Sequence, residues 1–134
     1  MPNFRKLFNS EKTIIGMVHL QALPGTANSK YTPEQIVDLA VEEASQLISY
    51  GFDGVLIENM HDTPYLLREV GPEIVATMTA ATAAVVDAID APVGVQVLAG
   101  ANKAALAIAK ATGAMFIRAE GFAFASIADE GVMD

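Results

Sequence analysis

Each of four short apolar runs in the sequence closes on a polar side chain that could bind a ligand or move a proton. These side chains are His19, Glu58, Gln96 and Arg118, with Glu120 just beyond the last. Because side chains alternate across a strand, each polar residue shares a face with the small or apolar residues two and four positions before it. Histidine and glutamate are common acid–base groups, and an arginine fork suits phosphate or carboxylate. We therefore expect one site assembled from four strand ends.

The stretch that follows Glu58 adds groups of the same kind. Asn59 and His61 come within three residues of that carboxylate, and the apolar run before it indicates a strand buried on both faces. Parallel α/β proteins place their ligands after the carboxyl ends of such strands. We predict that His19 and Glu58 are the catalytic pair, and that the ligand-binding residues are Asn59, His61, Gln96, Arg118 and Glu120.

Each of these assignments has a structural alternative. A carboxylate directly behind a buried run must be paired, solvated or functional. Arg118 could form an ion pair with Glu58 or Glu120 rather than bind an anion, and His19 could only hydrogen-bond a neighbouring strand. Asp62 is more simply explained as a turn residue. The sequence has neither an HxH nor an HExxH spacing, so it predicts no metal site, and it identifies no cofactor.

Alternating strands and helices must position these residues. The predicted strands are 13–20, 54–58, 93–98 and 115–119. The predicted helices begin at Pro33, at Pro72 and just after Asn102, and they end before Gly51, Asp90 and Gly113. Thr32 and Gln35 have the spacing of a capping box, and Asn102 is expected to cap the third helix. Strands joined by helices of this length form right-handed crossovers and a parallel sheet.

The number of strand–helix units indicates the fold. Four units of about 30 residues make half of a (β/α)8 TIM barrel, which has about 250 residues. A flavodoxin-like doubly wound sheet would need a fifth strand and a Gly-rich or Asp-rich first loop. We predict an N-terminal segment at 1–12 and a barrel domain at 13–134 that is truncated on its C-terminal side.

Composition limits the classes of partner and compartment. The net charge of −8 argues against general nucleic-acid binding and against docking on anionic lipid. The chain has no cysteine, so neither disulfides nor thiolate chemistry are expected. No apolar run approaches the ~20 residues of a membrane span, and none follows the basic amino terminus as in a signal peptide. We expect a cytoplasmic protein without membrane insertion.

Several segments in a fixed order resemble one family. They are 16–20 (GMVHL), 23–25 (LPG), 53–59 (DGVLIEN), 70–73 (VGPE), 92–98 (PVGVQVL), 111–118 (ATGAMFIR) and 129–131 (DEG). Over residues 14–134 the sequence is similar to the BtpA family, whose members are TIM-type barrels of about twice this length. Gln96 stands where many members have asparagine, 119–122 (AEGF) replaces a Val-Asn run, and 59–62 is closer to animal members. The resemblance is therefore closer to the non-photosynthetic members.

The resemblance also frames the expected function. The founding member is a photosystem I biogenesis factor, and SgcQ-type members lie among sugar-metabolism genes. We expect a small polar or phosphorylated metabolite of sugar or nucleoside type at the mouth, meaning the carboxyl ends of the strands, without a nameable reaction. A non-catalytic biogenesis or stability factor and an inert fragment remain alternatives. A half barrel exposes two strand edges, so we also expect a homo-oligomer through those edges.

Overall fold

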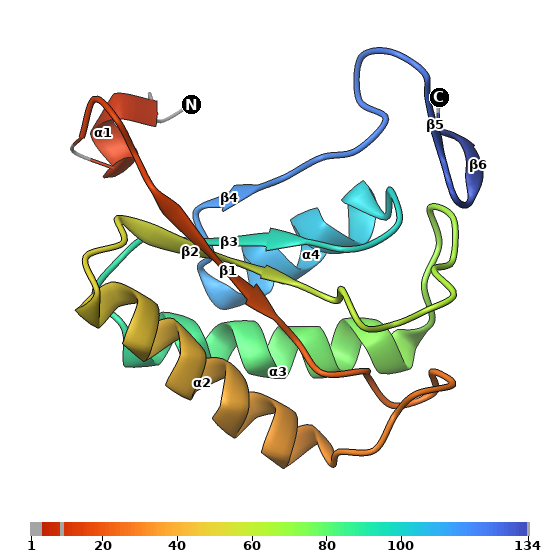
Figure 1. Ribbon diagram of the computed structural model, residues 1–134, viewed down its shortest axis with the longest axis horizontal. Coiled ribbons are helices and arrows are strands. Elements are labelled where there is room, and N and C mark those ends of the chain that lie inside the picture. Colours follow the sequence, from red (N-terminus) through yellow and green to blue (C-terminus); the bar gives the residue numbers. More distant parts are fainter. Residues whose placement is uncertain (1–3, 9, 134) are drawn as a thin grey trace.

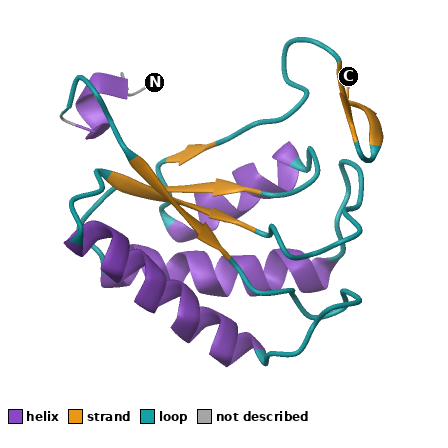
Figure 2. Cartoon of the chain, in the orientation of Figure 1, coloured by secondary structure: helices purple, strands orange, loops and turns teal. Residues whose placement is uncertain are grey.

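The computed structural model of the chain describes residues 4–8 and 10–133 (Figures 1 and 2). Residues 1–3 and 9 of the predicted N-terminal segment, and residue 134, lie outside the described residues. The helices are α1 (Phe4–Phe8), α2 (Pro33–Ser49), α3 (Pro72–Ala88) and α4 (Asn102–Thr112). The strands are β1 (Ile15–His19), β2 (Gly54–Glu58), β3 (Val93–Gln96), β4 (Phe116–Ile117), β5 (Ser126–Ala128) and β6 (Gly131–Met133).

The first four strands form one parallel sheet in the order β1-β2-β3-β4, with α2, α3 and α4 alternating between them (Figure 1). A doubly wound sheet would instead reverse its strand order and place helices on both faces. Here apolar side chains of α2, α3 and α4 pack in a single core with Val18, Val55, Ile57, Val93 and Val95 of the sheet. The architecture is α/β and is consistent with part of a β/α barrel.

The opposite face of the sheet carries the residues of the other parity. Leu56 and Glu58 of β2 alternate with Val55 and Ile57, and every residue of β2 is buried. A Cβ atom added to Gly94 would collide with the ring of Phe116 on the next strand, so glycine makes room for that ring. The polar side chains at the carboxyl end of this face meet one another across the sheet.

Helix boundaries follow the predicted signals, with one exception. Thr32 and Gln35 form the capping box at the start of α2: Thr32 N donates to Gln35 Oε1 over 3.0 Å, and Gln35 N donates to Thr32 Oγ1 over 3.3 Å. The prediction that Asn102 caps α4 is wrong, since Ala101 occupies that position without a side-chain cap. The Asn102 amide instead binds both backbone groups of Glu120, at 2.6 and 3.0 Å. Two satisfied backbone groups outweigh the single one that a cap would serve.

The last segment of the chain contains a feature that the sequence did not predict. β4 is shorter than the expected strand 115–119, and the chain after it turns into the antiparallel hairpin β5–β6. Met133 at the end of this hairpin is buried against Leu98, Ala99, Met60 and Tyr65, so the hairpin lies beside the loops that follow β2 and β3 (Figure 1). In the part of the chain that the structure describes, no helix has the length and apolarity to cross a membrane.

Candidate functional site

The ends of the four parallel strands bring the predicted residues together. His19, Glu58 and Gln96 are the last residues of β1, β2 and β3, and the strand register places them side by side. Arg118 follows β4 directly and reaches back across the sheet to Glu58 and Gln96. We call His19, Glu58, Gln96 and Arg118 the polar row. The predicted convergence of these four side chains is confirmed.

Glu58 is the centre of the polar row. Its side chain is only 1% exposed, and Arg118 Nη2 donates to its Oε1 atom over 2.8 Å. Its Oε2 atom lies 3.2 Å from His19 Nε2, yet among the described residues it has no partner with hydrogen-bond geometry. A buried carboxylate oxygen without a full hydrogen-bond partner is costly for stability.

Arg118 is committed to the protein on two sides. Its Nε atom donates to Gln96 Oε1, and its Nη1 atom lies 3.9 Å from the sulfur of Met17. Its charge is offset by Glu58, as the ion-pair alternative expected, whereas Glu120 is bound elsewhere. The side chain is 53% exposed and can still contact a ligand, but it does not bring an uncompensated positive charge.

His19 is the more accessible end of the pair with Glu58. Its side chain is 36% exposed, and its ring lies edge-on to the ring of His61, with 6.4 Å between the centroids. Glu43 on α2 interacts electrostatically with both rings. Partial burial raises the pKa of the Glu43 carboxyl, and the two nearby histidines act in the opposite direction. An accessible imidazole beside a buried carboxylate is the arrangement of a general acid or base.

Asn59 and Asp62 link three loops through buried hydrogen bonds. Asn59 Oδ1 accepts from Leu98 N over 2.7 Å, and Asn59 Nδ2 donates to Asp62 Oδ2 over 2.9 Å. Asp62 Oδ1 in turn accepts from Leu23 N over 2.8 Å. Both side chains are buried. This pair therefore joins the loops that follow β1, β2 and β3, which is more than the local turn expected of Asp62.

Glu120, like Asn59 and Asp62, holds a loop in place by hydrogen bonds. Its carboxylate accepts from Gly100 N over 2.6 Å, and its backbone is held by Asn102. Gly100 has a φ of +67°, a left-handed conformation that glycine adopts readily. Glu120 thus fixes the loop between β3 and α4 beside the polar row.

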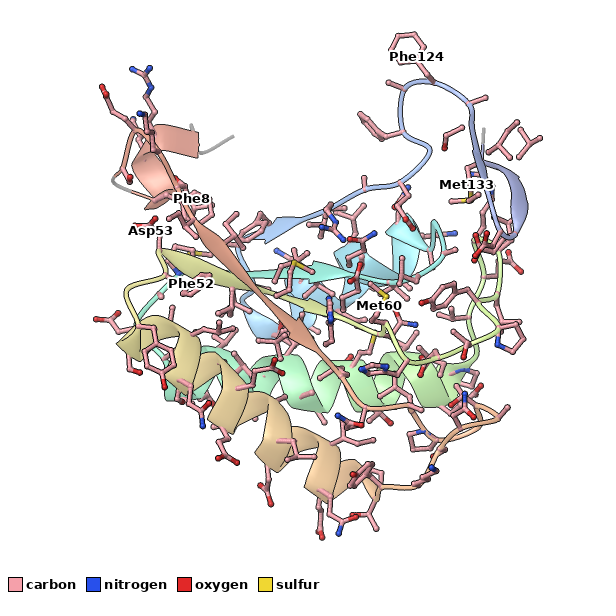
Figure 3. All side chains as sticks on the ribbon, viewed as in Figure 1. Phe8, Phe52, Asp53, Met60, Phe124 and Met133 are labelled. Carbon is pink, nitrogen blue, oxygen red and sulfur yellow. The ribbon has the colours of Figure 1, made fainter. Side chains whose placement is uncertain are left out.

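Two cavities adjoin the polar row. The sheet-face cavity, of about 300 Å³, is lined by Ile15, Met17, Leu56, Phe116, Ile117 and Arg118. The loop cavity, also about 300 Å³, is lined by Gln21, Ala22, Asn28, Lys30, Tyr31, Met60, His61 and Thr63. Figure 3 places Met60 on the loop that follows β2. Within residues 4–8 and 10–133 no group of three or more His, Cys, Asp or Glu side chains is placed to hold a metal ion.

Sequence reasoning missed two parts of this arrangement. Glu43 belongs by its sequence pattern to the acidic outer face of the helices, and its position near the histidines depends on how α2 packs on β1. Lys30 and Tyr31 lie in an irregular loop, where neither strand nor helix periodicity indicates the direction of a side chain. Only the folded path of two loops brings them beside His61.

The fold and the site define a parallel β/α protein with a polar site at the carboxyl edge of its sheet, the position at which such proteins bind their ligands. Comparison with known protein families gives a specific match for this chain. The BtpA family profile matches residues 10–134, and the chain belongs to the BtpA family.

Relatives occur in animals, archaea and cyanobacteria. An uncharacterized mitochondrial protein of Caenorhabditis elegans is 44% identical over 96% of this chain and 49% of its own length. An uncharacterized protein of Archaeoglobus fulgidus is 40% identical over 92% of this chain and 50% of its own. The photosystem I biogenesis protein BtpA of Synechocystis is 34% identical over 95% of this chain and 44% of its own.

The chain therefore spans about half the length of the curated relatives that it matches. No solved structure gave a significant match.

Proposed function

We propose that this chain forms the first half of a (β/α)8 barrel. The sequential strand order supports this proposal, as do the helices packed on one face. The length of the relatives, about twice that of this chain, supports it as well. A closed barrel would place the polar row inside the mouth, where its active-site loops converge.

At that mouth we propose a binding site for a small polar metabolite, phosphorylated and of sugar or nucleoside type. The observation that carries this proposal is the incomplete pairing of the buried Glu58 carboxylate, which lies between His19 and Arg118. A ligand hydroxyl could donate to the oxygen that lacks a full partner. A buried oxygen that lacks a hydrogen-bond partner costs the protein stability, and such a hydroxyl would supply the partner.

Each residue of the site has a proposed role. His19 exchanges a proton with the ligand, and Glu58 orients the imidazole and balances its positive charge, as a carboxylate does for an acid–base histidine. Gln96 holds Arg118 in place, and the exposed part of Arg118 contacts the ligand. Asn59, His61 and Glu120 shape the rim, the first and last of them through the loops that they bind.

A metabolite screen by thermal shift on the full-length protein tests the site. A ligand that binds only the folded state raises the melting temperature, by an amount that grows with its concentration over Kd. We expect a phosphorylated polar hit with the native protein, and none with Glu58→Gln or His19→Gln. Glu42→Gln, an exposed carboxylate on α2, should respond like the native protein. A hit that persists in both site variants would contradict the proposal.

A second candidate function has its own observations. One relative is named a photosystem I biogenesis protein, and the segment after β4 exposes large apolar side chains. Phe124 is 88% exposed and stands at the tip of that segment (Figure 3). Such side chains can serve a protein–protein contact, so a non-catalytic biogenesis or stability factor is the alternative.

The compartment is a separate proposal. The sequence favours the cytoplasm, whereas the Caenorhabditis elegans relative is named mitochondrial. Imaging of a tagged full-length protein would decide between the two compartments.

A further inference from the structure

The loop cavity has the chemistry of an anion site. It lies between the loop before α2 and the loop after β2, and its described lining contains no carboxylate. Lys30 and His61 contribute cationic or potentially cationic groups, while Asn28 and Tyr31 contribute hydrogen-bond donors. The chain as a whole carries a net charge of −8, but no acidic side chain stands among the described residues that line this cavity.

Lys30 and Arg118 differ in the ion pairs and hydrogen bonds that they already form within the protein. Arg118 is paired with Glu58 and Gln96, so its charge is largely used within the protein. Lys30 is exposed, and among the described residues its ammonium group has neither an ion-pair partner nor a hydrogen bond. A flexible ammonium at the rim of a cavity is a common phosphate ligand because it acts as a point charge with several donors.

The loop cavity also adjoins the polar row. His61 lines the cavity, and its ring lies 6.4 Å from that of His19. Glu43 is the carboxylate that interacts with both rings, and Asp62 with that of His61, but neither lines the cavity. One small molecule could therefore occupy the cavity with one end and reach His19 with the other. About 300 Å³ is at the low end of the range for ligand pockets.

We propose that the loop cavity binds the phosphate group of the metabolite, with Lys30 as its principal cation and Asn28, Tyr31 and His61 as further donors. This inference rests on the proposed function, because it assigns the anionic end of the same ligand. It also assigns the anion-binding role that was expected of Arg118 to Lys30, in the loop before α2.

The experiment uses the full-length protein and two probes, inorganic phosphate and ribose 5-phosphate, with ribose as the uncharged comparison. Amide chemical shifts are followed by NMR in the native protein, in Lys30→Gln and in Lys103→Gln. Lys103 is an exposed lysine on α4, away from the cavity, so its variant controls for net charge. His61→Gln serves as a second cavity variant.

We expect phosphate to shift the amides of 28–31 and 60–63. Affinity should fall about tenfold in Lys30→Gln, the loss that follows from removing one charged hydrogen-bond partner, and should not change in Lys103→Gln. Ribose 5-phosphate should bind more tightly than ribose in the native protein but not in Lys30→Gln. Equal phosphate affinity in Lys30→Gln and the native protein, with shifts centred on Arg118, would overturn the inference and leave the mouth site intact.

One further outcome separates the two proposals. If phosphate binding depends on Lys30 but ribose 5-phosphate leaves the signals of His19 and Glu58 unchanged, the cavity is an anion site and the proposed function of the polar row fails. His61→Gln should weaken phosphate binding in the same direction as Lys30→Gln, which excludes a local folding defect of one variant as the cause.

Discussion

Glu58 shows how strongly the type and place of one residue constrain a site. Behind a buried strand its carboxylate had to be paired, solvated or functional, and it is paired with Arg118 and close to His19. Pairing and function are compatible, because a carboxylate held by one partner through one oxygen can orient a second partner through the other. The ion pair makes Glu58 part of the stability of the protein as well as of the site.

The first prediction measures that pair. Glu58→Gln should lower the free energy of unfolding by about 1–3 kcal/mol, because it removes the charged hydrogen bond to Arg118, and the partial solvation of Arg118 limits the loss. Glu58→Gln and Arg118→Gln combined in a double-mutant cycle should show a coupling energy above about 0.5 kcal/mol. Chemical denaturation measures both quantities. The exposed Glu42→Gln should stay within about 0.5 kcal/mol of the native protein, and additive losses at the pair would refute the coupling.

The second prediction concerns pH and Asp62. Burial raises the pKa of its carboxyl, although hydrogen bonds from Leu23 and Asn59 and the nearby His61 partly offset the effect. With a raised pKa the folded state binds a proton at a pH where the unfolded chain does not, so this group adds stability as the pH falls. As the pH is lowered from 7 to about 4, the free energy of unfolding of the native protein should therefore rise relative to that of Asp62→Asn. Urea denaturation across that interval would show the opposite trend if the buried carboxylate preferred its charged form.

At the scale of elements, the loops at the mouth behave as one unit because buried side chains join them. Asn59 and Asp62 connect the segments after β1, β2 and β3, and Glu120 connects the segment after β4 to the β3–α4 loop. Loops that share buried hydrogen bonds lose their independent motion, since breaking one leaves a buried group without a partner. This is how a site built on irregular segments can keep a defined geometry.

A third prediction follows for Asn59. Asn59→Ala should cost about 1–3 kcal/mol by leaving the Leu98 N–H without its buried acceptor. The Leu98 amide should exchange with solvent faster, and so should the Leu23 amide if the loops are coupled through Asp62. Gln46→Ala, which removes an exposed hydrogen bond to Glu42 within α2, is the control. Faster exchange at Leu98 alone would show that the loops move separately.

The elements that the sequence predicted are those with strong local signals. The strand 54–58 is found with the expected bounds, because an unbroken apolar run between a glycine turn and a polar end leaves little choice. The capping box at Thr32 and Gln35 is likewise a local interaction. Alternating parity then sufficed to predict that the polar row converges.

What the sequence left out depends on contacts between distant segments. Asn102 had the type and position of a helix cap, but its amide is used by Glu120, eighteen residues later. The β5–β6 hairpin offered few apolar residues of alternating pattern, and its burial rests on Met133 alone. Lys30 gained its place beside His61 only through the paths of two loops.

At the scale of the whole molecule, the sheet ends in two edges and one incompletely covered face. Among the described strands, β1 and β4 each pair on one side only. Leu106 and Met115, beside the β4 edge, are each 58% exposed, and an apolar hollow of about 420 Å³ lies between α4 and β4. In a complete barrel the next strand–helix unit would cover this surface, and β1 would pair with the last strand.

The last prediction follows from these edges. Each large apolar side chain left uncovered forfeits about 1.5–3 kcal/mol, against a total stability of about 5–15 kcal/mol, so the 134-residue chain by itself should associate with a second copy or bind a hydrophobic dye. Sedimentation and ANS fluorescence measure both. Leu106→Lys should reduce the association, whereas Leu39→Lys, at an exposed position of α2 far from the β4 edge, should not. A monodisperse monomer that melts cooperatively and binds no dye would show that the sheet is complete as it stands, and the half-barrel proposal would then be wrong.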